Sequence, residues 1–280
     1  MKTLEDFCIH ILRSPSLADK LTAPPDDLLI QRPVSAVPEK PERENRISFS
    51  DKKSKIPRLE HLNIAVNRGI SMHHFANHEL QAVEIFAWAI LKYSEIPDEN
   101  RMDLFRSLLE EQKHLKLYLE RMNEFEIEFG ERPLNYIFWK FTPLMKTFEK
   151  FCAVMSVSIE GANLDYAMIY RKTFEGLGDI KSSEIMKIVY QDELKHVKRG
   201  YKVIEAGRND QSDWEYYRSL LEHPFTPRRA KGYFFIPFTR ENVGFSGEFI
   251  RNLGEYRDEF SNRKKEIIPE EMRSWGIYSG

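Results

Sequence analysis

Two short motifs carry the side chains best suited to chemistry in this sequence. Each has the form Glu-x-x-His: Glu111 with His114, and Glu193 with His196. Residues three apart on a helix lie on one face, so each motif can present a carboxylate and an imidazole to the same point. Either motif alone carries little weight, because a chain of 280 residues with 31 glutamates and 8 histidines is expected to contain about one by chance.

A further glutamate precedes each motif at almost the same distance. Glu79 lies 32 residues before Glu111, and Glu160 lies 33 residues before Glu193. In each half, this glutamate and its motif lie equally far from the predicted turn between two helices, about 20 Å along each helix at about 1.5 Å per residue. An antiparallel hairpin would bring them to the same height, and two such hairpins would present six ligands in one layer.

The surroundings of these side chains predict burial. Positions one or two turns away are apolar or small, such as Phe75 and Phe86 beside Glu79. Four buried carboxylates without a counter-charge would be strongly destabilising or would take up protons. Two divalent cations cancel four negative charges, and a Glu/His set without cysteine suits iron or manganese better than structural zinc. The predicted metal ligands are Glu79, Glu111, His114, Glu160, Glu193 and His196.

Two acidic residues directly precede the glutamates of the motifs. Glu110 and Asp192 could each accept a hydrogen bond from the ligand histidine of the opposite motif and so fix its orientation. A solvated position is the common alternative for an acidic residue on a helix. For Asp192 we expect the contact with the histidine.

The first of these helices contains competing candidates. Glu84 lies five residues after Glu79, about 140° round the helix, so both cannot face one site, and Glu84 is the fallback ligand. His74 and His78 are four residues apart and could form a separate metal pair. No third ligand falls naturally on their face, so we expect surface or hydrogen-bonding roles for both.

Two further groups have a functional and a structural interpretation. Tyr118, Tyr166 and Tyr190 lie within reach of the ligand layer and could be redox-active, although core packing is the expected role. The basic cluster at residues 228–231, Arg-Arg-Ala-Lys, could bind phosphate or RNA. Nearby acids and a net charge of −2 favour a solvated loop instead.

Long periodic runs of apolar residues predict the helices that must position the ligands. They cover residues 71–93, 98 to the 120s, 144–175 and 179–207, with Asp98 and Asp179 as expected N-caps. Pro97 separates the first two helices, and residues 176–178, Gly-Leu-Gly, separate the last two. We therefore predict an all-α fold built from two helical hairpins.

The flanks of this region have a different composition. Residues 1–21 predict a small helix, and the proline-rich residues 22–58 predict an extended arm, either loose or wrapped on the bundle. Trp214–Leu221 predicts a short helix, and residues 223–280 read as irregular. The predicted domains are residues 1–60 (helix and proline-rich arm), 61–210 (four-helix metal domain) and 211–280 (irregular arm).

The composition excludes several classes of protein. A charged fraction of 31% and a mean hydropathy of −0.53 are typical of a soluble helical protein, and no uncharged apolar stretch is long enough to cross a membrane. Charged residues interrupt the first twelve residues, which do not resemble a signal peptide. With only Cys8 and Cys152, no disulfide framework forms. We expect a cytoplasmic protein without a membrane or nucleic-acid partner.

These residues resemble the ferritin-like superfamily, whose helix bundles carry this pattern of glutamates and Glu-x-x-His motifs. The resemblance rests on residues 78–84, 110–114 and 192–196, together with Glu160-Gly161-Ala162. More narrowly, the chain is similar to a bacterial ferritin-like family of uncharacterised function with a proline-rich N-terminal arm. It is distantly similar to the di-iron monooxygenase that hydroxylates a modified adenosine in tRNA.

The resemblance implies a ferritin-like four-helix bundle with irregular terminal arms and two iron ions, or iron and manganese. It implies that Glu111 and Glu193 bridge the ions and that Glu79 and Glu160 are terminal ligands. The long flanking arms depart from the storage ferritins and argue against a closed iron-storage cage.

We expect an oxidoreductase that activates dioxygen and hydroxylates or oxidises an organic substrate, either a small molecule or a modified nucleoside, with electrons from a separate donor. One alternative is a ferroxidase or peroxide-handling protein without an organic substrate. Another is a non-catalytic interaction protein that metal stabilises. The sequence leaves the oligomeric state open and does not separate iron from manganese, because both accept the same ligands.

Overall fold

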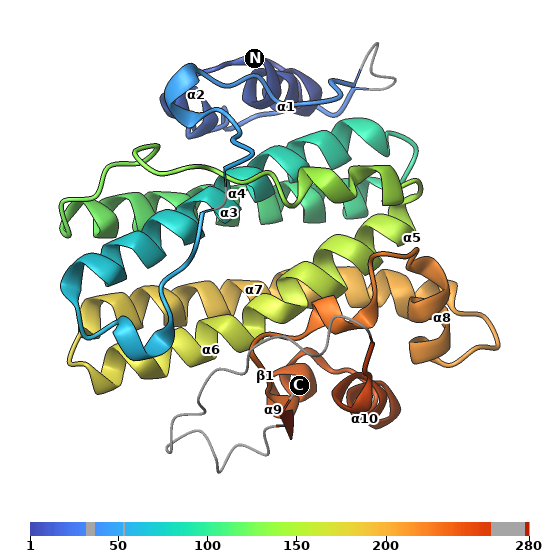
Figure 1. Cartoon of the computed structure of the whole chain (residues 1–280). Coiled ribbons are helices and arrows are strands. Elements are labelled where there is room, and N and C mark those ends of the chain that lie inside the picture. Colours follow the sequence, from blue (N-terminus) through green and yellow to red (C-terminus); the bar gives the residue numbers. More distant parts are fainter. Residues whose placement is uncertain (32–36, 53, 259–277, 280) are drawn as a thin grey trace. The chain divides into compact units, whose positions relative to one another are not determined.

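The computed structural model describes residues 1–31, 37–52, 54–258 and 278–279. Within these ranges the regular secondary structure is almost entirely helical, which confirms the predicted all-α class (Figure 1). The chain divides into two compact units: residues 1–57 with 63–142, and residues 58–62 with 143–280. None of the described helices combines the length and the apolar character that a membrane crossing requires.

A long antiparallel hairpin forms the centre of the first unit. Helix α3 spans Ala65–Lys92 and helix α4 spans Asp98–Asn123, and the two lie side by side (Figure 1). Helix α3 begins six residues before the predicted start at residue 71. Gly69 lies in this extension, where a Cβ would come within 2.6 Å of the Cβ of Phe125, so glycine permits a close approach.

The start of α4 differs in detail from the prediction. Pro97 is the N-cap, not Asp98, and no side chain caps the helix. Asp98 and Glu99 lie in the first turn instead, where their negative charge is favourable beside the positive end of the helix dipole.

The N-terminal residues pack on this hairpin. They form helix α1 (Leu4–Arg13), helix α2 (Leu17–Lys20) and a 3₁₀ helix, Asn45–Ile47. The described part of the proline-rich segment is wrapped on the unit, because Glu42 N–H donates to the carbonyl of Leu12 at 2.7 Å and Ser50 N–H donates to that of Leu134 at 2.9 Å. Residues 32–36 and 53 of this segment lie outside the described residues.

A second hairpin forms the centre of the second unit. After the 3₁₀ helices Leu59–His61 and Trp139–Leu144, a helical run consists of α5 (Phe148–Phe151), a π-helix (Cys152–Glu160) and α6 (Gly161–Gly176). Helix α7 (Ile180–Gly207) lies beside α6 (Figure 1). Asp179 caps α7 as predicted, since its side chain accepts a hydrogen bond from Ser182 N at 3.1 Å.

The C-terminal part contains more regular structure than predicted. It forms α8 (Asp213–Leu220), a 3₁₀ helix (Pro227–Ala230), α9 (Pro237–Val243) and α10 (Gly247–Glu255), and β1 (Phe234–Phe235) pairs antiparallel with β2 (Tyr278–Ser279). The prediction of an irregular segment from residue 223 was wrong over α9 and α10. Local signals set both helices: Pro237 begins α9, Gly244 ends it with a left-handed φ of 101°, and Ser246 caps α10.

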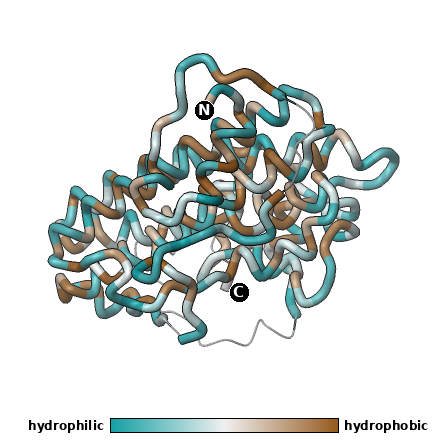
Figure 2. The backbone as a smooth tube through the Cα atoms, turned by 90° about the horizontal axis from the view of Figure 1, so that it is seen from above, coloured by the Kyte–Doolittle hydropathy of each residue, from teal (hydrophilic) through white to brown (hydrophobic). Residues whose placement is uncertain are grey.

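Apolar residues recur along the helices of both hairpins, as the alternating brown and teal segments of Figure 2 show. Leu80 and Leu108 are fully buried in the first hairpin, and Leu164 and Val189 are fully buried in the second. The buried positions also include acidic and histidine side chains, and all six predicted ligands are among them.

Candidate metal centre

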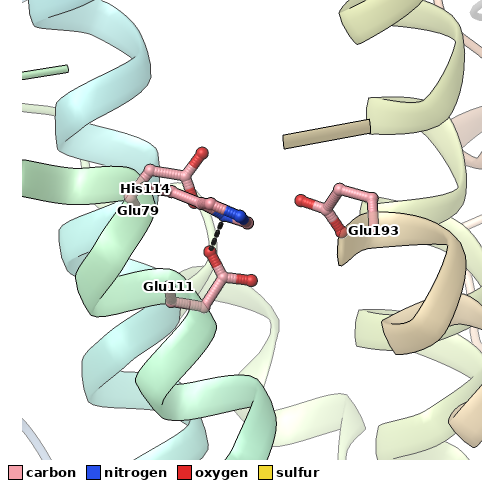
Figure 3. Close-up of side chains that lie close together, drawn as sticks. All are labelled: Glu79, Glu111, His114 and Glu193. Atoms are coloured by element: carbon pink, nitrogen blue, oxygen red, sulfur yellow. Dashed lines mark hydrogen bonds and ion pairs between the residues drawn. The ribbon is translucent and has the colours of Figure 1, made fainter. Parts of the chain in front are cut away.

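Three of the predicted ligands meet in the first unit (Figure 3). Glu79 points from α3, and Glu111 and His114 point from α4, toward one another. His114 Nδ1 lies 3.3 Å from Glu111 Oε2 and 3.9 Å from Glu79 Oε2. All three side chains are buried. The hairpin therefore brings this triad to one height, as the spacing predicted.

The other three predicted ligands meet in the second unit. Glu160 is the last residue of the π-helix, and Glu193 and His196 lie on α7. His196 Nδ1 lies 3.4 Å from Glu193 Oε2 and 3.8 Å from Glu160 Oε1. All three are buried. The second triad thus reproduces the two distances of the first to within about 0.1 Å.

Each triad fits a divalent cation. Two atoms that each lie about 2.1 Å from one ion can be at most about 4.2 Å apart, and all four imidazole–carboxylate distances meet this limit. The charge fits as well, because two carboxylates and one neutral imidazole carry a charge that one divalent cation cancels. Burial makes ionised carboxylates unfavourable without such compensation. These buried clusters could therefore hold metal ions.

The π-helix positions Glu160 at its junction with α6. A π-helix closes its hydrogen bonds over five residues instead of four. Ser158 Oγ donates to the carbonyl of Ala153, five residues back, at 2.7 Å, and it is also hydrogen-bonded to Tyr217 Oη at 2.6 Å. Helix α7 approaches closely here, since a Cβ on Gly200 would lie 2.3 Å from Ser156 Cβ. The apolar pattern of residues 144–175 gave no sign of this change in winding.

One residue that the spacing did not single out contacts a predicted ligand. Asn163 Nδ2 donates a hydrogen bond to Glu193 Oε1 at 2.7 Å. Asn163 follows Glu160 by three residues on α6, so it lies on the same helix face. A polar residue at this offset from the first glutamate was the signal in the sequence.

The two acids before the motif glutamates differ in burial. Asp192 is buried and accepts a hydrogen bond from Lys195 Nζ at 2.7 Å, whereas Glu110 is half-buried. Their hydrogen bonds to the histidine of the opposite motif stay predictions.

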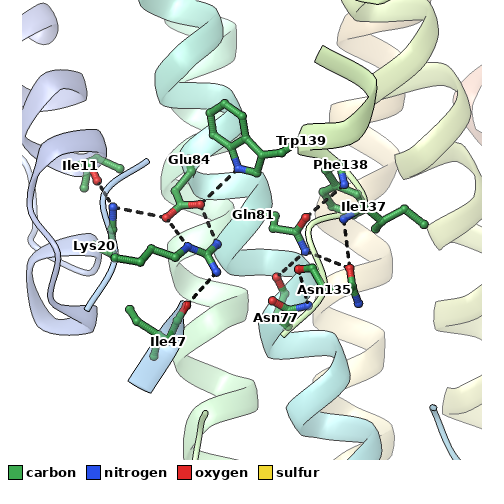
Figure 4. Close-up of polar contacts among 11 residues, drawn as sticks. Ile11, Lys20, Ile47, Asn77, Gln81, Glu84, Asn135, Ile137, Phe138 and Trp139 are labelled. Carbon is green, nitrogen blue, oxygen red and sulfur yellow. Dashed lines mark hydrogen bonds and ion pairs between the residues drawn. The ribbon is translucent and has the colours of Figure 1, made fainter. Parts of the chain in front are cut away.

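Glu84, the fallback ligand, faces other partners (Figure 4). Arg43 donates Nε and Nη2 to its two oxygens at 3.0 and 2.7 Å, and Lys20 Nζ lies 3.3 Å from Oε1. Trp139 Nε1 donates to Oε2 at 3.4 Å. This buried carboxylate compensates two buried cations and belongs to none of the candidate metal clusters among the described residues, whereas Glu79 of α3 belongs to one. Burial lowers the pKa of Lys20.

A matching acid anchors the C-terminal segment in the second unit. Asp165 accepts hydrogen bonds from Gly232 N at 3.0 Å and Ile236 N at 3.1 Å, and it forms a fully buried ion pair with both terminal nitrogens of Arg240. Burial raises the pKa of Asp165, and Arg240 opposes that rise. Asp165 follows Glu160 by five residues, as Glu84 follows Glu79.

The histidines of α3 do not form a separate metal site. The rings of His74 and His78 lie 4.4 Å apart, but no cluster of three metal-ligating side chains includes either of them among the residues that the structure describes. His73 Nε2 accepts a hydrogen bond from Gly130 N at 3.1 Å. Burial lowers the pKa of both His73 and His74 to about 4, so both are neutral at physiological pH.

The three tyrosines near the ligand layer pack against other side chains. The Tyr118 ring lies 5.4 Å from that of Phe75, and the Tyr166 ring lies 4.9 Å from that of Tyr233. Tyr190 Oη accepts a hydrogen bond from Asn242 Nδ2 at 3.1 Å.

The basic cluster at residues 228–231 is not the solvated loop that we predicted. Lys231 is buried, and its Nζ donates to the carbonyls of Gly254 at 3.3 Å and Tyr256 at 2.8 Å. Burial lowers the pKa of Lys231 to about 7. Arg228 donates to the carbonyl of Lys231 at 3.1 Å. Backbone carbonyls of the C-terminal segment therefore bind these side chains.

Comparison with family models relates the chain to a known protein family. Searches among curated proteins and among solved structures found no match to this chain. A family model described as "Protein of unknown function (DUF455)" matches residues 12–251, a range that contains both triads, Glu84 and Asp165. Because the match extends over most of the chain, this protein belongs to the DUF455 family.

Proposed function

We propose that the two triads combine into one di-iron centre, or an iron–manganese centre, within a ferritin-like four-helix bundle. The observation that carries the proposal is the repetition of one triad, with the same residue types and nearly the same distances, in two separate hairpins. In this arrangement Glu111 and Glu193 would each hold both ions, and Glu79 and Glu160 would each hold one, with His114 and His196 as the imidazole ligands.

We infer that the centre serves an oxidoreductase that activates dioxygen and hydroxylates or oxidises an organic substrate. Six protein side chains shared between two ions would leave coordination positions open for an exogenous ligand, and mixed carboxylate–imidazole sites suit redox-active iron. Bound iron would supply the reaction with dioxygen, while the chain orients the ligands and surrounds them with apolar residues that exclude water. A small molecule or a modified nucleoside is the substrate class, and a separate protein or small reductant supplies electrons.

Metal stoichiometry and spin coupling test the centre. Anaerobic titration of the apo-protein with Fe(II) should end at two equivalents, and the oxidised protein should show the magnetic coupling of two carboxylate-bridged irons by Mössbauer spectroscopy. E111A and E193A should each lose that coupling. E175A should retain the coupling, because Glu175 is exposed and forms an ion pair with Lys172. A wild-type protein with one iron, or with two uncoupled irons, would refute the shared centre.

Exposure to oxygen in the presence of a substrate panel tests the activity. Incorporation of labelled oxygen into an organic product is the expected result. Multiple turnovers of ferrous oxidation without any organic product would instead establish a ferroxidase. If E111A lowers the melting temperature and no oxygen-dependent activity is found in the wild type, the metal has a structural role alone.

A further inference from the structure

The carboxylate of Glu193 has two different environments at its two oxygens. Asn163 Nδ2 lies 2.7 Å from Oε1, while Oε2 lies 3.4 Å from His196 Nδ1. The amide must donate to this acceptor, because an ionised carboxylate has no hydrogen to give. The hydrogen bond withdraws electron density from Oε1 and fixes the rotation of the carboxylate, so Oε2 is the oxygen beside the imidazole.

The first hairpin has a different residue at the corresponding position. The residue three positions after Glu79 is Ala82, which is buried and has no hydrogen-bonding side chain, whereas Asn163 is three positions after Glu160. The helix face that carries the first glutamate therefore offers an amide donor in one hairpin and a methyl group in the other. The motif glutamates are chemically identical, and this neighbour makes them inequivalent.

We propose that Asn163 is a positioning residue for metal binding, which holds Glu193 so that Oε2 and His196 Nδ1 face the same ion. This inference rests on the proposed metal centre and adds an asymmetry to it. The ion beside His196 would have a ligand whose orientation Asn163 fixes, whereas the alanine at position 82 offers no side-chain donor. Glu193 should consequently lose this fixed orientation in variants that lack the Asn163 amide.

Cobalt(II) provides a readout that is independent of turnover. The full-length apo-protein would be titrated with Co(II) by calorimetry and by visible absorption, which reports the coordination of each ion. N163L keeps the approximate size of the side chain and removes the donor, and N163A removes the whole amide at a half-buried position. N252A is the matched control, because Asn252 donates to Glu248 at 3.5 Å on the exposed side of α10, away from the triads.

Loss of a hydrogen bond behind a metal ligand typically weakens metal affinity by about 10- to 100-fold. We expect N163L and N163A to weaken Co(II) binding by this factor and to alter the absorption bands, with the larger change in one of the two equivalents. N252A should leave both equivalents unchanged. The apo-protein melting temperatures of both Asn163 variants should stay close to that of the wild type.

The outcomes separate this inference from the metal centre itself. A wild-type protein that binds fewer than two Co(II) ions contradicts the centre. Two wild-type equivalents that N163L and N163A bind with unchanged affinity and spectra contradict the role of Asn163 alone. Equal weakening of both equivalents, together with a lower apo-protein melting temperature, also overturns it, because a general structural defect then explains the loss.

Discussion

The two hairpins place the same three side chains with different neighbours. In the first hairpin, Phe75 and Tyr118 lie one helical turn from the predicted ligands, and their ring centroids are 5.4 Å apart. At the matching positions, the second hairpin has Ser156 and Gly200, and there the backbones approach so closely that a Cβ on Gly200 would lie 2.3 Å from Ser156 Cβ. The comparison teaches that helix register sets the geometry of a triad, since opposite packing solutions give the same distances.

The two hairpins are similar on the helix face that points away from the predicted ligands. Glu84 and Asp165 each lie five residues after the first ligand glutamate, both are fully buried, and each binds an arginine from a flanking segment. That offset turns the acid about 140° away from the ligand face. Each of these helices therefore carries the candidate metal ligands on one face and binds the N-terminal or C-terminal segment of its unit with another.

Breaking either buried ion pair should have the largest effect on stability. E84A leaves Arg43 and Lys20 without their shared carboxylate, and D165A leaves Arg240 in the same condition. We expect each change to lower the free energy of unfolding by about 3–5 kcal/mol, measured by urea denaturation at pH 7. E175A, which removes an exposed pair with Lys172, should cost less than about 1 kcal/mol. If either E84A or D165A cost no more than E175A while the other cost about 3–5 kcal/mol, the two buried ion pairs would not be equivalent.

Low pH should lower the free energy of unfolding through the first hairpin, by less than the loss of a buried ion pair does. His73 has a folded-state pKa of about 4, below its unfolded value, so the unfolded chain binds more protons between pH 4 and about 6.5. Stability should therefore fall as pH drops through this range. In H73Q, whose amide can still accept from Gly130 N–H, the fall should be smaller by roughly 2–3 kcal/mol. Denaturation curves at pH 4.5, 5.5 and 7 measure the difference, and equal slopes for both proteins would contradict it. Residues 148–207 contain one histidine, His196, so the second hairpin has no counterpart of His73.

The close approach in the second hairpin can be tested with one methyl group. G200A forces α7 away from the π-helix, because Ser156 Cβ is attached directly to the backbone and cannot move aside. Overpacking of this kind destabilises a protein by about 1–3 kcal/mol. G176A is the matched control, since a Cβ there meets nothing within 4 Å. Equal melting temperatures for the two variants would show that the hairpin does not depend on this contact.

The second helices of the hairpins begin differently, and this should give the smallest effect. Asp179 caps α7 through Ser182 N, so D179A should cost about 1 kcal/mol. Asp98 lies in the first turn of α4 behind Pro97, where its negative charge is favourable at the helix end, so D98A should cost about half as much. Thermal denaturation of both variants compares the two starts. A larger loss of stability for D98A than for D179A would contradict the assignment of Asp179 as the stronger helix cap.

The meeting of the three side chains within each hairpin was predictable, because their positions depend on helix register, which residue spacing states directly. Glu79 and Glu111 needed only an antiparallel hairpin to meet. The π-helix was not predictable, because its winding depends on tertiary partners, such as Tyr217 beside Ser158, and leaves the apolar pattern unchanged.

The buried cations were missed for a related reason. A lysine or arginine in a polar, proline-rich segment is normally exposed. Lys20 and Arg43 are buried because Glu84 compensates them, and Arg43 is 41 residues away from it in the sequence. The five-residue offset shared by Glu84 and Asp165 was visible in the sequence, but it becomes informative only once both partners are known. The short helices α9 and α10 extend over too few residues for periodicity to reveal them.

The π-helix has a consequence for length variation in this family. A π-turn contains one more residue than an α-turn, and here the wide turns end at Glu160, so the surplus is absorbed upstream of the ligand. Homologues with a one-residue deletion between residues 148 and 159 should wind as ordinary α-helix, yet keep the counterparts of Glu160 and Asn163 on one face. Gaps in a family alignment should accordingly cluster before this glutamate and be absent between it and the Glu-x-x-His motif that follows, where a single lost residue would rotate one ligand away from the others.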